Sequence, residues 1–174
     1  MSINNVELVE NYTRILGNSQ QVPFSLGPSE VIKLSTPTSR QSLSISLRDP
    51  VSRRINITAN DGYIYLTNLR LIYITAFQGD INTFLIDMKG APDLHFSHAL
   101  KSPWFGPNYW EFMFFNASRP NVVTDGLPKN EWFKGKIAFN DGGIFSFVEV
   151  MNQVLNDAAN NAEIDEELPR YTPT

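Results

Sequence analysis

Cysteine is absent from the 174-residue chain, and histidine occurs only twice, at His95 and His98. The lack of cysteine excludes a disulfide scaffold, a thiolate nucleophile and a zinc site with cysteine ligands. On the strand that we expect over Asp93–His98, positions three apart point to opposite faces. The two imidazoles therefore cannot share a metal ion or pair a base with a nucleophile there.

Other marks of an enzyme are missing as well. Asp87 and Asp93 are separated by an expected turn, and the chain has no glycine-rich loop of the kind that cradles a phosphate. We therefore expect a protein that is not an enzyme and that uses no cofactor and no metal ion.

Long apolar runs are also absent. No stretch approaches the roughly 20 apolar residues that a membrane-spanning helix needs. Residues 1–10 do not combine a basic start with an apolar run, so we expect no secretory signal.

The net charge of −4 is unevenly placed along the chain. Residues 160–174 carry four acidic side chains against Arg170, a sum of −3, which leaves about −1 for the rest. A nearly neutral body lacks the basic face that direct nucleic-acid binding requires, so we expect no nucleic-acid partner.

What the chain does contain is many short segments rich in β-branched and aromatic residues, bounded by turn residues. Ser42–Leu47, for example, alternates strictly between apolar and polar residues, which indicates a strand with one solvated face. The expected strands are Glu30–Leu34, Ser42–Leu47, Ile55–Ala59, Tyr63–Thr67, Leu71–Thr75, Thr83–Met88, Asp93–His98, Trp110–Phe115 and Trp132–Asn140.

Two turns are expected within this set. Asn68-Leu69-Arg70 joins two of the strands into a hairpin, with Asn68 suited to a left-handed conformation. Asn60-Asp61-Gly62 is a strong turn signal just before that hairpin. We expect the hairpin to be buried on one side, that of Tyr65 or that of Ile64 and Leu66.

One strong helix is expected after Asp141-Gly142-Gly143, from Ile144 to about Ala159. Apolar residues recur there at helical spacing, and Asp141 or a neighbouring backbone group is a candidate cap for its start. Many strands followed by one amphipathic helix predict a mainly β (α+β) fold of the pleckstrin-homology type, a bent barrel capped by the helix. We divide the chain into an N-terminal extension (1–28), the domain (29–160) and an acidic, disordered tail (161–174).

Three elements in this order resemble the GRAM domain of the WW-domain-binding protein 2 family. They are Tyr65-Leu66-Thr67, Phe105-Gly106-Pro107-Asn108-Tyr109 and Gly142-Gly143-Ile144. The resemblance covers residues 11–162. It implies an adaptor that works in cytoplasm and nucleus, binds WW-domain proteins such as ubiquitin ligases or transcriptional co-regulators, and meets the transcription machinery indirectly, as a coactivator does.

The tail departs from the family pattern, because it is short and has no Pro-Pro-x-Tyr motif. It contains Leu168-Pro169-Arg170-Tyr171 instead. Pro169 and Tyr171 supply the two anchors of a WW ligand in a polyproline-II conformation, and Leu168 replaces the first proline with another apolar contact. A solvated tail without a partner is the competing interpretation.

Binding of phosphoinositides or other anionic lipids is the second function that such a fold invites. It requires several cations that converge on a phosphate-sized pocket. The candidates are Arg53, Arg54, Arg70, Lys134 and Lys136, of which Lys134 and Lys136 share one face of a strand. Solvated strand edges, which also prevent aggregation, are the alternative explanation for these residues.

The aromatic segment Phe105–Trp110 has two interpretations. Tryptophan and tyrosine are good anchors for a binding patch. We favour the other interpretation, in which Gly106 and Pro107 shape a turn into a strand and the aromatic rings fill the core.

Overall fold

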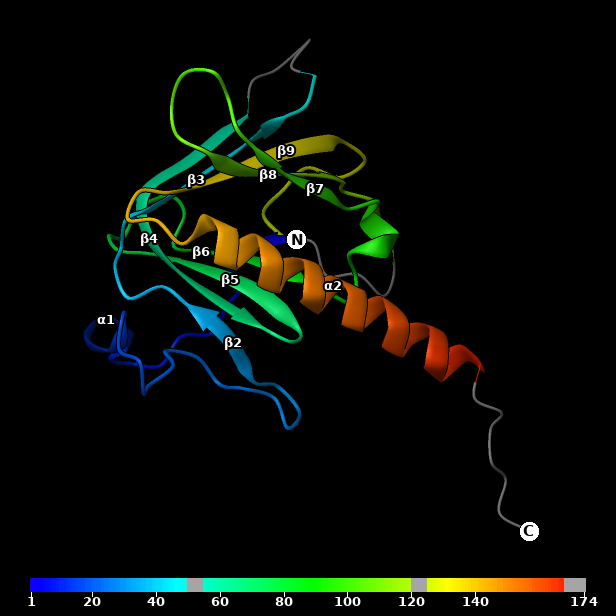
Figure 1. Ribbon diagram of the computed structural model, residues 1–174, viewed down its shortest axis with the longest axis horizontal. Coiled ribbons are helices and arrows are strands. Elements are labelled where there is room, and N and C mark those ends of the chain that lie inside the picture. Colours follow the sequence, from blue (N-terminus) through cyan, green and yellow to red (C-terminus); the bar gives the residue numbers. More distant parts are fainter. Residues whose placement is uncertain (50–54, 120–124, 168–174) are drawn as a thin grey trace.

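A bent antiparallel sheet and one long helix make up the computed structural model of the chain, which describes residues 1–49, 55–119 and 125–167 (Figure 1). The strands follow the order β1-β6-β5-β4-β3-β9-β8-β7, with β2 paired to β4. Their bounds are β1 Ser2–Ile3, β2 Ile32–Ser35, β3 Gln41–Leu47, β4 Asn56–Thr67, β5 Arg70–Thr75, β6 Thr83–Asp87, β7 Ser97–Lys101, β8 Tyr109–Phe115 and β9 Trp132–Phe139. The path ends at β1 and β7, so the sheet is open and is not a closed barrel.

The helix α2 (Ile144–Glu167) packs its apolar stripe against the concave side of this sheet. Ile144, Phe147, Met151 and Val154 are all buried there. Their spacing of three or four residues places them on one helical face, as the sequence predicts. The resulting fold, mainly β with one C-terminal helix, confirms the predicted fold class.

Aromatic rings fill the space between the helix and the two halves of the sheet. Phe112 lies at the centre, with ring centroids 5.7 Å from Phe84, 6.3 Å from Phe114 and 5.0 Å from Trp110. All four side chains are fully buried. Such stacked and tilted pairs add to the stabilisation that burial of the rings already provides.

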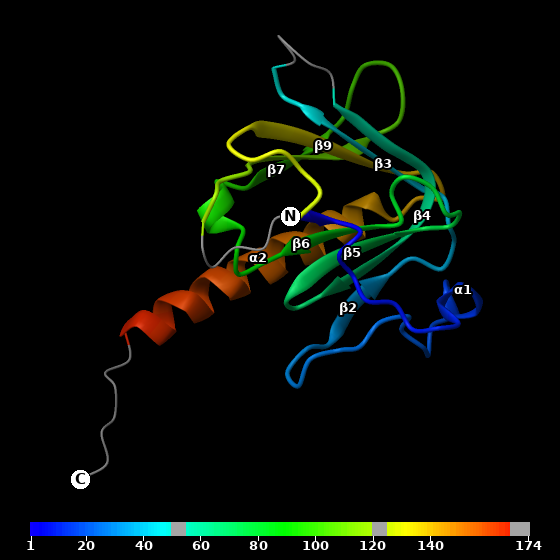
Figure 2. The ribbon, with the colours of Figure 1, turned by 180° about the vertical axis from the view of Figure 1, so that it is seen from behind.

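The hairpin β4–β5 is buried on both faces, not on one as expected. Ile64 and Leu66 belong to the main core, whereas Tyr65 joins Phe24 and Ile72 in a second cluster on the opposite face. The N-terminal segment, including α1 (Tyr12–Ile15), covers this second cluster (Figure 2). Residues 1–28 therefore form part of the folded unit.

The turn predicted at Asn60-Asp61-Gly62 is wrong, because β4 runs straight through it. Asn60 and Asp61 together oppose Ser42, which makes a β-bulge between Gln41↔Gly62 and Leu43↔Ala59. A Cβ at Gly62 would overlap the phenol ring of Tyr73 on the paired strand. The glycine therefore permits a close approach and does not reverse the chain.

The strand predicted over Asp93–His98 is also wrong. Pro92–Leu94 forms a short 3₁₀-helix, η1, and His95 follows it in a left-handed conformation (φ 50°, ψ 44°). Only from Ser97 does the chain become the strand β7. The argument that His95 and His98 share a strand therefore does not hold.

The helix also differs from expectation at both ends. Gly142 and Gly143 have φ values of 83° and 93°, a region that favours glycine, and the carbonyl of Gly143 accepts the first helical bond from Phe147. Asp141 does not cap the helix, because its carboxylate binds Arg40 and Thr38. At the other end the backbone of α2 is helical as far as Glu167, beyond the expected end at about Ala159.

Candidate functional site

The hairpin tip is held in place by a network that the sequence only partly reveals. The Thr67 hydroxyl accepts hydrogen bonds from the backbone N–H groups of Leu69 (3.0 Å) and Arg70 (2.9 Å), which closes the two-residue turn. Asn68 has a negative φ, contrary to expectation. Its carboxamide accepts a bond from the Val31 N–H and donates one to the Ser29 carbonyl.

Glu30 links this turn to the segment before β2. Its carboxylate accepts bonds from Arg70 Nε (2.7 Å), Arg70 Nη2 (3.0 Å) and the Thr67 hydroxyl (2.7 Å). Burial would raise the pKa of Glu30, but the hydrogen bonds from Arg70, Thr67 and the Gly27 N–H outweigh burial and hold this pKa below its usual value. Arg70 therefore has a structural role at the hairpin tip, where its guanidinium is paired with Glu30.

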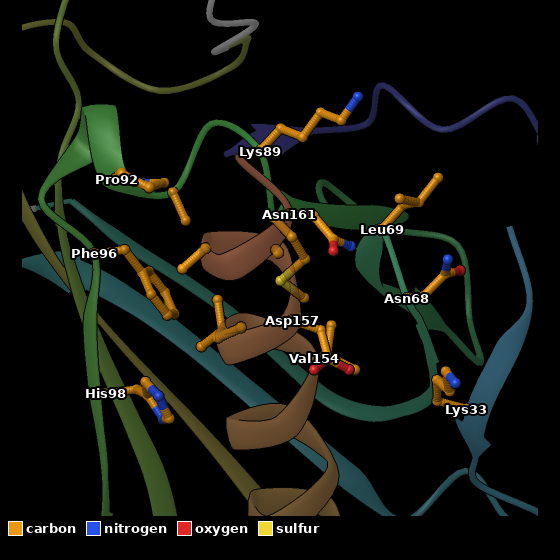
Figure 3. A pocket seen from close by; sticks show the side chains of 15 residues that line it. Lys33, Asn68, Leu69, Lys89, Pro92, Phe96, His98, Val154, Asp157 and Asn161 are labelled. Carbon is orange, nitrogen blue, oxygen red and sulfur yellow. The ribbon is translucent and has the colours of Figure 1, made fainter. Parts of the chain in front are cut away.

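A groove of about 1050 Å³ opens around the C-terminal half of α2 (Figure 3). Phe96 and His98 lie on one side of the helix, and Asn68, Leu69 and Lys33 lie on the other. Met88, Ala91 and Val154 form a buried apolar floor. The volume is similar to the upper end of ligand pockets, about 300–1000 Å³.

His98 is a neutral part of this groove wall. Its Nδ1 accepts a hydrogen bond of 3.1 Å from Trp110 Nε1, which requires that nitrogen to be unprotonated. Burial lowers the pKa of His98, which favours the same neutral form. His95 lies apart from it and packs against Trp132 at 6.3 Å, so the two histidines do not form one site.

The aromatic loop between β7 and β8 contradicts the expectation that its rings fill the core. Trp104 and Phe105 are 98% and 92% exposed. Only Trp110, already within β8, is fully buried. Pro103, Gly106 and Pro107 are the signal that could have shown this, because such residues mark a loop tip outside the sheet.

Two of the predicted lipid-binding cations, Lys134 and Lys136, lie within the described residues, and each contacts a neighbouring side chain of the sheet. Lys134 lies 3.4 Å from the Glu111 carboxylate, and Lys136 lies over the Tyr109 ring at 4.8 Å. The two lysines do share the outer face of β9, as predicted. Arg53 and Arg54 lie outside the described residues.

The WW-ligand motif of Leu168, Pro169 and Tyr171 also lies outside the described residues. What the structure describes is its attachment: α2 runs to Glu167, the residue directly before the motif. Figure 1 shows the end of this helix extending beyond the sheet.

Within residues 1–49, 55–119 and 125–167, no group of three or more histidine, aspartate or glutamate side chains is arranged to hold a metal ion. No helix of the same residues has the length and apolar character needed to cross a membrane.

Comparisons with known proteins agree with the fold and leave the function open. No protein-family profile matches the chain. A "UPF0664 stress-induced protein" from Schizosaccharomyces pombe is 30% identical over 120 residues, which cover 66% of this chain and 63% of that protein. The similarity thus spans less than two thirds of the relative's length.

Among solved structures, the N-terminal PH domain of Vps36 is similar to this chain, with a TM-score of 0.53 and 15% sequence identity. The match covers 82% of this chain and 91% of that domain. It establishes a PH-domain-like fold, which is compatible with lipid or protein binding. Membership of the WW-domain-binding protein 2 family stays a prediction.

Proposed function

We propose that this chain is a non-enzymatic adaptor of the WW-domain-binding protein 2 type. Its PH-like domain is the folded platform, and Leu168-Pro169-Arg170-Tyr171 is the ligand for WW domains. The main support for the proposal is the position at which α2 ends. The helix continues past Ala158, which packs against the core, and its last residue, Glu167, directly precedes the motif in the sequence.

The three elements behind the family resemblance have clear structural roles, which supports this proposal. Thr67 closes the hairpin turn, and Gly142 and Gly143 adopt the left-handed backbone that starts α2. Gly106, with φ 98°, shapes the exposed aromatic loop. These positions shape the folded domain. In this proposal the choice of partner therefore depends on the tail motif.

The proposed role places the protein in cytoplasm and nucleus, where the WW domains of ubiquitin ligases and transcriptional co-regulators are its partners. A contribution to transcription would be indirect, through such a co-regulator. The Schizosaccharomyces pombe relative is described as stress-induced, so stressed cells are the natural setting in which to look for the complex.

Replacing Tyr171 with alanine is expected to weaken binding to a responsive WW domain about 30-fold. The change removes one of two anchor side chains, and truncation of such an anchor costs about 2 kcal/mol or more. Fluorescence polarisation with the full chain and a panel of purified WW domains from ubiquitin ligases measures the effect.

Thr174→Ala is the matched control, because it alters the same tail outside the two anchors, and we expect it to bind as the wild type does. Equal affinity of wild type and Tyr171→Ala across the panel would refute the adaptor role of this motif.

Binding to an anionic membrane is the second candidate, and the exposed Trp104 and Phe105 favour it. Aromatic side chains at a loop tip insert readily into the membrane interface. There the apolar ring contacts the acyl chains while polar atoms stay near the headgroups. Lys101 lies at the end of β7, close to this tip in sequence. Arg53 and Arg54 are the predicted headgroup ligands for this alternative.

A Trp104→Ala/Phe105→Ala variant is expected to lose at least about tenfold in partitioning to phosphatidylserine-containing vesicles, because two large apolar side chains no longer leave water. Sedimentation of the full chain with vesicles measures this at low and high salt. Arg53→Glu/Arg54→Glu should remove the salt-sensitive part of the binding.

The matched control is Phe77→Ala/Phe145→Ala, which removes two other exposed aromatic side chains. Equal loss in both double variants would show that the loop has no special role. A wild-type chain that stays in the supernatant with every vesicle would exclude the membrane candidate.

A further inference from the structure

We infer that the groove between β7 and α2 is a peptide-binding site, which takes an extended segment of a partner protein as an added strand. The inference is independent of the tail motif and goes beyond the WW-ligand role. It rests on three observations: an open strand edge, an apolar wall opposite that edge, and a lysine at one end.

The open edge is that of β7, which ends the strand path and, among the described residues, pairs only with β8. In an antiparallel pair, alternate residues direct both their N–H and C=O groups away from the partner strand. Within the described residues, no backbone hydrogen bond outside the β7–β8 ladder involves residues 97–101. The edge therefore presents a row of donors and acceptors that a further strand can satisfy.

The helix does not close this edge. α2 packs more closely on β2 and β8 than on β7. Leu155 and Ala158 of the helix and Phe96 and His98 beside them line the groove, and all four are only partly buried. Figure 3 shows Phe96 and His98 on one side of α2, facing the helix.

The open edge of β7 and the apolar wall of α2 together indicate which kind of ligand fits the groove. A strand added to β7 directs every second side chain to the same face as His98 and Leu100, the partly buried positions of β7. Those side chains would contact the apolar wall of α2, so alternate apolar residues are required. A fatty acid would fill the apolar part but would leave the backbone groups of β7 unmatched.

Lys89 adds a charge preference. It is exposed at one end of the groove, and it forms no ion pair with another described residue. An acidic residue at the corresponding end of the peptide would be its complement. The expected ligand is thus an extended peptide with two or three alternating apolar residues and an acidic residue at one end.

Selection of a phage-displayed library of random twelve-residue peptides on the immobilised full chain tests this inference. Synthetic copies of the selected peptides are then titrated into the ¹⁵N-labelled full chain. We expect amide shifts confined to β7 and to residues 154–161 of α2. Shifts centred on any other surface, or a library that yields no binder, would overturn the inference.

Backbone methylation of the selected peptide distinguishes strand addition from simple side-chain binding. N-methyl groups at every second position should each weaken binding at least tenfold, while those between should have little effect, because only alternate N–H groups face β7. Uniform tolerance along the peptide would refute strand addition. This readout changes only the peptide, so it does not depend on how a protein variant folds.

Two protein variants complete the test. Ala158→Arg fills the groove and should weaken binding at least tenfold, whereas Asn156→Arg adds the same charge on an exposed part of α2 outside the groove and should not. Tyr171→Ala should bind the peptides as the wild type does, which separates this site from the tail motif. Unchanged peptide affinity in Ala158→Arg would contradict the inference. So would a chain in which sodium oleate shifts the same amides and no peptide binds.

Discussion

Replacing Arg70 with alanine is expected to lower the free energy of unfolding by about 3–5 kcal/mol, because it leaves a carboxylate buried without its partner. The Glu30 side chain is only 3% exposed and receives two bonds from the guanidinium. Arg70 also donates to the Ser25 carbonyl at 2.7 Å and lies 4.9 Å above the Phe24 ring. All of these contacts disappear together.

Urea unfolding at pH 7 measures this loss. Arg40→Ala is the matched control, because Arg40 pairs with Asp141 at 2.8 Å but the two side chains are 61% and 39% exposed. An exposed pair is worth less than about 1 kcal/mol. A Glu30→Leu/Arg70→Leu variant should recover much of the stability, and failure to do so would show that the buried charge is not the cause.

The same pair sets a pH dependence. The pKa of Glu30 lies below its unfolded value of 4.5, so its contribution to stability is complete above that pH and is lost as the pH falls through the lower, folded value. In Glu30→Gln this component of the acid loss should be missing. An unchanged difference in stability between pH 6 and pH 3 in that variant would contradict the assignment.

Gly135→Ala is the second variant with a large expected effect, a loss of about 3 kcal/mol or more. Gly135 on β9 pairs with Phe112 on β8, and the Phe112 ring lies directly over it. A Cβ there would overlap that ring, which is fully buried and stacks with Phe84, Phe96 and Phe114. Overpacking of a dense core costs 1–3 kcal/mol and occasionally more.

Thermal and urea unfolding of Gly135→Ala measure the loss, with Gly79→Ala as the control, since a Cβ at Gly79 meets no atom within 4 Å. The control should change stability by less than about 0.5 kcal/mol. A smaller side chain at the opposite position, Phe112→Leu, should partly rescue Gly135→Ala. If the double variant is no more stable than the sum of the two single changes predicts, the steric explanation is wrong.

Local pattern was sufficient for much of this fold. The alternation of Ser42–Leu47 predicts the buried face of β3, and the β-branched runs on both sides of Asn68 predict the hairpin. The helical stripe from Phe147 to Val154 likewise predicts the buried face of α2. In each case the signal is a period within one element, which a single sequence contains.

Prediction and structure differ where the role of a residue depends on a contact with a residue far away in the sequence. Gly62 has the local signature of a turn, but its role is to make room for Tyr73 on the next strand. Glu30 and Arg70, forty residues apart, gave no local signal of pairing. The groove is assembled from Lys33, Leu69, Phe96 and Leu155, so no segment of the sequence could show it.

The length of α2 has a consequence for how the two proposed sites would act together. From Asn161, which lines the groove, to Glu167 the helix rises about 9 Å at 1.5 Å per residue. A rigid spacer of this size would keep a partner on the tail clear of the groove and of the aromatic loop. Both partners could then be held at once, each at a high effective concentration for the other, as in a bivalent scaffold.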